Sequence, residues 1–212
     1  ALFHYSRDRR GEHPRAHLVS WAGILQADAY GGYGELYRDG RQPGPVFEAG
    51  CFAHARRKFF ELADVEGAVR KKSRGERTEQ IYPIALEAVQ RLEALFDLER
   101  RVNGLPSRER LSARQEHSAP LMADLHAWLH AQLARLSRNH DLAKAINYML
   151  RRWPAFARFL EDGRVCITNN AAERALRGVT LGRKSWLFCG SDRGGQRAAV
   201  MYSLIGTAKL NN

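Results

Sequence analysis

The middle of the chain holds three stretches in which apolar residues recur at helical spacing, and this feature constrains the fold most. The stretches cover residues 81–101, 119–136 and 142–160. In the second one, Leu121, Leu125 and Leu129 share one face of a helix. Because such helices become stable when their apolar faces pack on one another, we expect an all-α block in this part of the chain.

Shorter elements of mixed type are expected on both sides of this block. The pattern predicts strands at residues 2–6, 23–28, 164–167 and 186–189, and helices at residues 14–21, 51–63, 195–210 and from 169 onward. Strands that alternate with helices are typical of an α/β fold. We therefore predict one α/β domain, formed by residues 1–64 and 163–212, that a helical insertion at residues 65–162 interrupts.

The charge of the chain favours a polyanionic partner. Lys and Arg total 34 against 23 Asp and Glu, a net charge of +11, which suits nucleic acid or an acidic membrane surface. The basic stretch at residues 69–77 is interpreted as a solvated linker. No apolar run approaches the roughly 20 residues that cross a bilayer, and the N-terminus lacks a secretory pattern. We expect a protein of the cytoplasm with no membrane partner.

The cysteines and the chain ends give further information on the type of protein and on whether the chain is complete. Cys51, Cys166 and Cys189 are widely spaced and odd in number, which fits neither a disulfide framework nor a paired zinc motif. The chain begins with Ala1, and residues 207–212 resemble a helix cut in mid-course. We therefore expect both ends to be truncated.

Asp28 is the first candidate for chemistry. It ends a short apolar run and precedes Gly31, Gly32 and Gly34, so it is expected at the C-terminal end of a strand. An aspartate in this place is often only a turn former. It can equally serve as an oxygen ligand of Mg²⁺, and the residue pattern leaves both readings open.

Glu173 is the second candidate. Thr168 or Asn169 can cap the helix that begins there, and Asn170, Glu173 and Arg177 then share one face. A surface ion pair between Glu173 and Arg177 would explain that face without any function. The alternative is that Glu173 and Asp28 together bind the ions used in phosphoryl transfer on DNA.

Several basic residues and two histidine motifs remain open. Contact with DNA phosphates and scattered solvated charge are both compatible with the basic residues Arg56, Arg57, Lys58, Arg177, Arg183, Lys184, Arg193 and Arg197. Cys51 and His54 form a C-x-x-H spacing without a second pair, which favours a buried cysteine and a hydrogen-bonded histidine over zinc. His126 and His130 lack the glutamate of a zinc protease.

Five ordered blocks resemble the insertion-sequence-66 family of bacterial transposases over essentially the entire chain. They are residues 25–30 (LQADAY), 50–59 (GCFAHARRKF), 169–175 (NNAAERA), 181–188 (LGRKSWLF) and 202–210 (YSLIGTAKL). The resemblance implies a ribonuclease-H-like core with a D-D-E carboxylate triad and a helical insertion before the glutamate. Asp28 matches the second aspartate and Glu173 the glutamate.

The resemblance also implies partners and chemistry. It implies Mg²⁺ or Mn²⁺ bound by Asp28 and Glu173, DNA strand cleavage and joining at transposon ends and target, and action at the nucleoid of a bacterial cell. A homo-oligomer assembled on DNA is compatible with it. Cys51 and His54 match a C-x-x-H element of several transposase families, and Asn169 and Asn170 lie in the block that carries the glutamate.

The chain departs from the family in three respects. The first aspartate has no match here, so we expect the enzymatic core to be incomplete and this chain alone to be inactive. Ala29 stands where the family usually has glycine, and Thr168 where it usually has aspartate. A non-catalytic remnant that binds DNA and a ribonuclease-H-like nuclease outside transposition are the alternatives.

Overall fold

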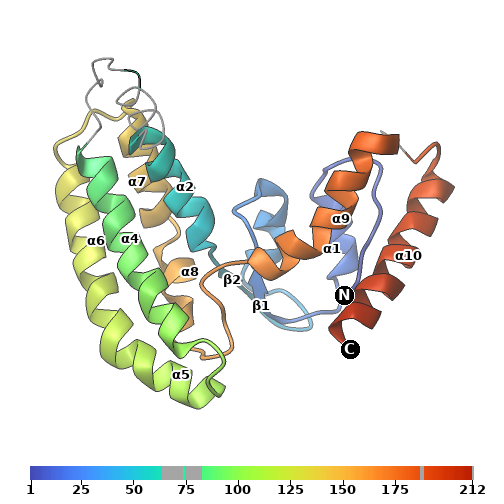
Figure 1. Ribbon diagram of the computed structural model, residues 1–212, viewed down its shortest axis with the longest axis horizontal. Coiled ribbons are helices and arrows are strands. Elements are labelled where there is room, and N and C mark those ends of the chain that lie inside the picture. The colour runs from blue at the N-terminus through green and yellow to red at the C-terminus, as the bar shows by residue number, and fades with distance from the viewer. Residues whose placement is uncertain (64–73, 75–82, 187–188, 212) are drawn as a thin grey trace. The chain divides into compact units, whose positions relative to one another are not determined.

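The computed structural model describes residues 1–63, 74, 83–186 and 189–211, with the side chains of 183–186 excepted. The chain divides into two compact units. The terminal unit comprises Ala1–Gly23, Tyr30–Val46 and Asn169–Asn212, and the helical unit comprises Ile24–Ala29 and Phe47–Thr168. Each unit is described by itself below (Figure 1).

The helical unit is a bundle, and it confirms the all-α block that the periodicity predicts. Its elements are α2 (Phe52–Ala63), α4 (Pro83–Val102), α5 (Ser107–Ala113), a π-helical turn (Arg114–Ser118), α6 (Ala119–Leu133), α7 (Asp141–Leu150), α8 (Trp153–Ala157) and a 3₁₀ turn (Arg158–Leu160). Helices α2, α4, α6 and α7 lie side by side (Figure 1). The sequence pattern missed α5.

The helix expected at residues 142–160 is wrong as a single element, because the chain breaks it between α7 and α8. Arg152 leaves helical geometry at φ −117° and ψ 23°, and Pro154 lies in the first turn of α8. Proline has no N–H to donate to the carbonyl four residues earlier, and it disfavours helical geometry in the residue before it. The apolar spacing continues across the break because both helices face one core.

Aromatic rings form the centre of that core. Phe52 of α2 meets Phe156 of α8 with ring centroids 5.0 Å apart, and it meets Phe159 at 5.6 Å, both edge to face. Leu92 of α4 and Ile146 of α7 are fully buried in the same cluster. These contacts join residues from the beginning and the end of the helical unit in the sequence, so its helices share one core.

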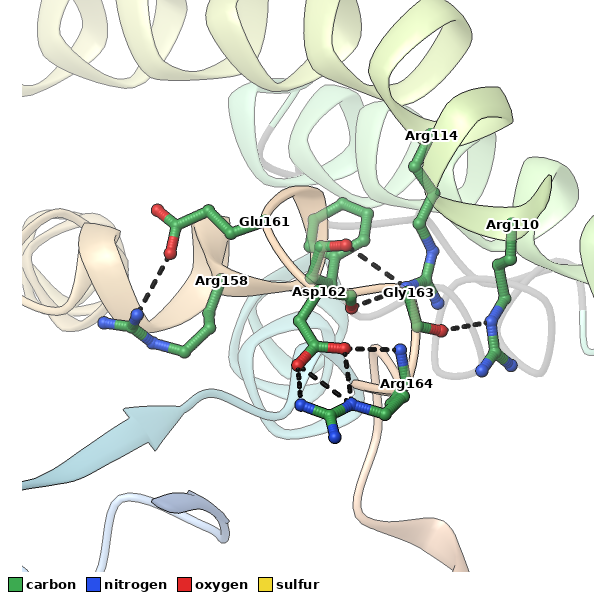
Figure 2. A network of polar contacts seen from close by, with 8 residues as sticks. Arg110, Arg114, Arg158, Glu161, Asp162, Gly163 and Arg164 are labelled. Carbon is green, nitrogen blue, oxygen red and sulfur yellow. Dashed lines mark hydrogen bonds and ion pairs between the residues drawn. The ribbon is translucent and has the colours of Figure 1, made fainter. Parts of the chain in front are cut away.

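A buried arginine ties the π-helical turn to the segment after α8. Arg114 is 1% exposed, and its Nε and Nη2 each donate to a carboxylate oxygen of Glu99 at 2.7 Å. Its Nη1 donates to the carbonyls of Phe159 and Asp162, and Arg110 donates to the carbonyl of Gly163 at 2.5 Å (Figure 2). A charge this deeply buried is tolerated only because all these acceptors surround it.

The described residues contain one small sheet of two parallel strands, β1 (Gly23–Gln26) and β2 (Val46–Ala49). The amide of Gly23 donates to the carbonyl of Pro45 at 3.0 Å, and that of Ala27 donates to Ala49 at 3.4 Å, which sets a constant register. The prediction of β1 is confirmed, and β2 was missed. Together with the helices, this sheet is consistent with an α/β fold.

The strand expected at residues 164–167 is wrong. Val165 and Ile167 are buried in the helical core, but their backbone makes a turn and a helix-start contact instead of a ladder. The amide of Val165 donates to Asp162 at 3.1 Å, and the carbonyl of Ile167 accepts from the amide of Phe52 at 2.9 Å. Short apolar runs cannot distinguish a strand from a buried loop by periodicity alone.

The terminal unit contains α1 (Glu12–His17), a 3₁₀ helix (Gly31–Tyr37), α9 (Asn170–Trp186) and α10 (Asp192–Leu210). The helices expected from residue 169 and at 195–210 are confirmed, whereas α1 ends four residues before the predicted limit of 21. Trp186 ends α9 rather than opening a strand, and residues 187–188 lie outside the described part, as do residues 69–73 and 75–77 of the expected linker.

The strand expected at residues 2–6 is also wrong. The segment is extended, but its polar groups bind side chains of α10 rather than a neighbouring strand. The terminal amino group of Ala1 donates to Thr207 at 3.1 Å, the amide of Phe3 donates to Ser203 at 2.9 Å, and the hydroxyl of Tyr5 donates to Asp192 at 2.9 Å. Gly195 of α10 leaves the space that the Tyr5 ring occupies.

Candidate functional site

Asp28 and Cys51 leave the two strands of the sheet at the same edge. Asp28 follows β1 directly after Ala27, whose amide is bonded to Ala49, the last residue of β2. Cys51 comes two residues after Ala49 and is almost fully buried, whereas Asp28 is half-buried. The carboxyl edge of parallel strands is where α/β proteins usually place their ligands. Asp28 therefore occupies the position that the sequence predicted for it.

The start of α2 lies at this edge and carries the C-x-x-H pair. The buried thiol of Cys51 agrees with the prediction for that residue. The Nδ1 atom of His54 is buried and has no hydrogen-bond partner among the described residues. A buried imidazole nitrogen without a partner is costly unless another group satisfies it.

Tyr148 of α7 lies near the same edge, and the sequence reasoning missed it. Burial raises the pKa of Tyr148, the Arg152 guanidinium opposes this rise, and electrostatic interactions with Cys51, Asp28 and Glu48 add to it. The Arg152 guanidinium carbon lies 5.4 Å from the Tyr148 ring centroid and forms an ion pair with Glu48 of β2, which places the phenol beside this end of the sheet. In the sequence, the feature that could have indicated Tyr148 is its i,i+4 spacing from Arg152. This spacing is common and does not by itself indicate a functional site.

Glu48 on β2 and Arg152 after α7 form a partly buried ion pair. Their Oε1 and Nε atoms are 3.7 Å apart. Burial raises the pKa of Glu48, and Arg152 lowers it in part. The pair joins the turn after α7 to β2, the strand that runs beside β1.

Glu173 belongs to the first turn of α9 in the terminal unit. Its side chain is exposed, and its Oε1 accepts from the amide nitrogen of Asn169 at 3.3 Å. The backbone carbonyl of Asn169 accepts from the amides of Ala172 and Glu173. The expected side-chain cap by Asn169 is not formed, because its buried Oδ1 has no partner among the described residues.

The structure does not support a surface ion pair between Glu173 and Arg177 on α9. Arg177 is exposed, and the described side chains show no ion pair between it and Glu173. Asn170 is exposed as well. Among the described side chains, the Glu173 carboxylate is therefore held by Asn169 rather than by an arginine.

Two arginines of α2, Arg56 and Arg57, border a groove of about 430 Å³ between α2 and α4. Arg56 approaches Glu93 at 3.0 Å and lies over the ring of Phe60 at 5.3 Å. The Arg56 Nε makes no hydrogen bond of acceptable geometry with any residue that the structure describes, so its contact with Glu93 is an ion pair only. The residues that line the groove are Ala53, Arg56, Arg57, Phe60, Glu93, Phe96 and Arg100.

The other predicted phosphate contacts are on exposed surfaces. Arg57 and Lys58 on α2 are exposed, and so are Arg193 and Arg197 on α10. Arg183 and Lys184 lie within α9, and their side chains are outside the described ones. The sequence predicted these residues from charge alone, and the structure adds only the groove beside Arg56.

One cluster of ligand-type side chains was not predicted. Asp8, Glu12 and His13 in the terminal unit place their ligand atoms within 4.8 Å of one another. The Asp8 carboxylate already accepts from the Arg10 amide at 3.0 Å and contacts His13 Nε2 at 2.7 Å. These contacts lower the pKa of Asp8, with the Arg10 amide as the largest cause. The cluster is explained by its own hydrogen bonds.

The comparisons with known proteins identify a family of transposases. The model of the transposase IS66 family matches residues 1–197. The chain belongs to the IS66 transposase family. None of the helices in the described part of the chain has the length and apolar character that a membrane span requires.

Curated relatives from Sinorhizobium fredii share much of the sequence. The uncharacterized protein y4hP is 53% identical over the whole of this chain, and y4jD is 36% identical over 98% of it. The chain spans 38% of the length of each of these two relatives. The protein y4qI is 35% identical over 92% of this chain. No solved structure matches.

Proposed function

We propose that this chain is part of a D-D-E transposase in which Asp28 and Glu173 bind the metal ions of DNA strand cleavage and joining. The observation that carries the proposal is the position of Asp28 at the carboxyl edge of parallel strands in a chain of the IS66 transposase family. A ribonuclease-H-like core is the fold that joins this edge to a glutamate helix such as α9. DNA ends and target DNA are the partners.

The donor atoms fit Mg²⁺ or Mn²⁺. Hard cations of this kind prefer carboxylate and amide oxygens and retain several waters. Asp28 supplies a half-buried carboxylate, and Glu173 supplies an exposed one. Beside Glu173, the buried Oδ1 of Asn169 has no partner within the described part of the chain, which is the condition in which an amide oxygen can accept from a ligand water or bind an ion. The chemistry of these side chains therefore supports a metal-binding role.

The side chains have separate tasks in this proposal. When bound, the metal activates water or a 3′-hydroxyl and stabilises the leaving oxygen of an in-line displacement. Asp28 and Glu173 hold negative charge for it, and the Asn169 amide orients the Glu173 carboxylate. Arg56, Arg57 and Lys58 contact phosphates of DNA, as do the arginines of α9 and α10, and these contacts position DNA without reading sequence.

The test uses a longer protein that contains these 212 residues, incubated with Mg²⁺ and DNA of the element's ends. We expect Asp28→Asn and Glu173→Gln each to reduce strand cleavage at least about 100-fold, since even outer-shell partners of metal sites cost 10–100-fold. Glu61→Gln, which removes an exposed carboxylate of α2, is the matched control and should retain activity. Cleavage that persists in both Asp28 and Glu173 variants would refute the metal-binding role.

A non-catalytic DNA-binding role is the second candidate, and the arginine-lined groove between α2 and α4 favours it. In that case, DNA affinity falls steeply with salt while no metal-dependent cleavage occurs in the unmodified protein. Hydrolysis without strand joining would instead indicate a nuclease outside transposition.

A further inference from the structure

Two cationic side chains make cation–π contacts with the ring of Tyr148. The Nζ atom of Lys58 lies 4.7 Å from the ring centroid, and the guanidinium carbon of Arg152 lies 5.4 Å from it. Lys58 is an exposed residue of α2, and Tyr148 is half-buried on α7. The three side chains come from two helices and the turn after α7, and they place two positive charges and a phenol hydroxyl around one point.

This point lies at the strand edge from which Asp28 emerges. The Gly50 amide, directly after β2, donates to the carbonyl of Ala155 at 2.9 Å and so fastens α8 to the strand end. A Cβ atom on Gly50 would come within 3.0 Å of the Phe156 ring, so the approach is close. The ion pair of Arg152 with Glu48 makes a second connection to β2. The helical insertion is thus bound to the sheet beside Asp28.

We propose that Lys58, Tyr148 and Arg152 form a phosphate-binding ledge that holds a phosphodiester group of DNA next to Asp28. This inference rests on the proposed function, because it takes Asp28 as the carboxylate at which the chemistry occurs. An ammonium, a guanidinium and a phenol O–H are all donors to phosphate oxygens, and the two cations strengthen those bonds. Because both cations already contact the ring, the ledge suits a phosphate better than a stacked base.

The insertion then has a direct role in placing the substrate. The phenol O–H of Tyr148 donates to a phosphate oxygen, and the Lys58 and Arg152 cations beside its ring attract the same anion. Glu48 is a positioning residue that holds Arg152. Neither Tyr148 nor Arg152 belongs to the blocks that carry the family resemblance.

The first experiment measures binding of the 212-residue chain to a short DNA duplex without metal, at several salt concentrations. Lys58→Gln should weaken binding about 3- to 10-fold and reduce the salt slope by about one. Lys144→Gln removes the same charge from an exposed position on α7 and should change affinity less than about 2-fold. Tyr148→Phe keeps the ring and should weaken binding about 3-fold with an unchanged salt slope.

The second experiment locates the DNA. Acetylation of lysines is followed by mass spectrometry, and bound duplex should protect Lys58 while Lys144 still reacts. Binding with Lys58 unprotected and with Tyr148→Phe unchanged would overturn the ledge but leave DNA binding, and hence the proposed function, standing. If the 212-residue chain binds no DNA at all, the ledge is overturned. The metal-binding role is tested separately, and it would still be supported if Asp28→Asn abolished cleavage in the longer protein.

Discussion

The two units of this chain differ in what holds them together. The helical unit buries rings and aliphatic side chains from α2, α4, α6, α7 and α8 in one cluster. In the described part of the terminal unit, Leu36 and Val46 are the buried apolar side chains, while α10 exposes large ones that include Val200, Met201 and Leu204. Its segments are joined mainly by polar contacts with α10, such as those of Ala1 and Tyr5.

This difference has a direct energetic meaning. Burial of an apolar side chain stabilises by about 1.5–3 kcal/mol, whereas an exposed ion pair contributes about 0–1 kcal/mol. The Arg7–Asp192 pair has an arginine that is 79% exposed, so it belongs to the second class. We therefore expect the helical unit to unfold in a cooperative transition and the terminal unit to add little to it.

The largest effect is expected from removal of the buried arginine. Arg114→Ala leaves the Glu99 carboxylate and two carbonyls without their donor, and loss of one partner of a buried pair costs about 3–5 kcal/mol. Urea unfolding followed by circular dichroism should show this loss. Arg108→Ala, on the exposed surface of α5, is the control and should stay within about 0.5 kcal/mol.

The double variant Arg114→Met with Glu99→Leu separates charge from packing. Replacing both partners with apolar residues of similar size is often neutral or stabilising. Recovery of most of the lost stability would show that the cost comes from the unpaired charge. A double variant as unstable as Arg114→Ala would instead mean that the hydrogen bonds of Arg114 to Phe159 and Asp162 hold the segment after α8 in place. Polar contacts would then stabilise the helical unit as well as the terminal unit.

A matched pair of glycine substitutions compares the units directly. In the helical unit, a Cβ atom on Gly163 would come within 1.8 Å of the Ser107 carbonyl oxygen, so the backbone itself must move. In the terminal unit, the nearest atoms to a Cβ atom on Gly195 would be those of the Tyr5 ring, at 2.3 Å, and that side chain is 38% exposed and can turn away. Gly163→Ala should cost about 3 kcal/mol and Gly195→Ala about 1 kcal/mol or less.

Unfolding curves of the two glycine variants provide the measurement. Equal losses would mean that the segment of Tyr5 is held as rigidly as the α5 region. In that case the terminal unit would be more tightly packed than its exposed side chains indicate.

The same contrast explains what the sequence could predict. Helices α2, α4 and α6 follow from apolar spacing, which is a local property. The strands expected at 2–6 and 164–167 failed because a strand needs a partner, and the sequence does not state which residues will lie beside it. Pro154 did mark the break between α7 and α8, but the continuous apolar spacing concealed it.

The candidate site also has residues that the sequence could predict and residues that it could not. The position of Asp28 could be predicted because a short apolar run followed by glycines marks a strand end. The approach of Tyr148 to that edge could not, because 120 residues separate them in the sequence and the contact depends on how α7 packs on α2. The unpartnered atoms of His54 and Asn169 likewise appear only in three dimensions.

The smallest effect is expected from Asp162, and it tests whether a surface-type contact matters even in the well-packed unit. Hydrogen bonds from the Arg164 side chain and then from its amide lower the pKa of Asp162 to about 2 (Figure 2). The group therefore contributes stability above its unfolded pKa of about 4, and this contribution is lost as the pH falls toward 2. Because Arg164 is 79% exposed, solvent screening should limit the effect to about 1 kcal/mol. Asp162→Asn should accordingly be less stable than the parent at pH 7, with the gap narrowing between pH 4 and pH 2. Equal stability of the two proteins at every pH would instead show that the Arg164 amide, which asparagine can still bind, sets the conformation of this turn without help from the carboxylate charge.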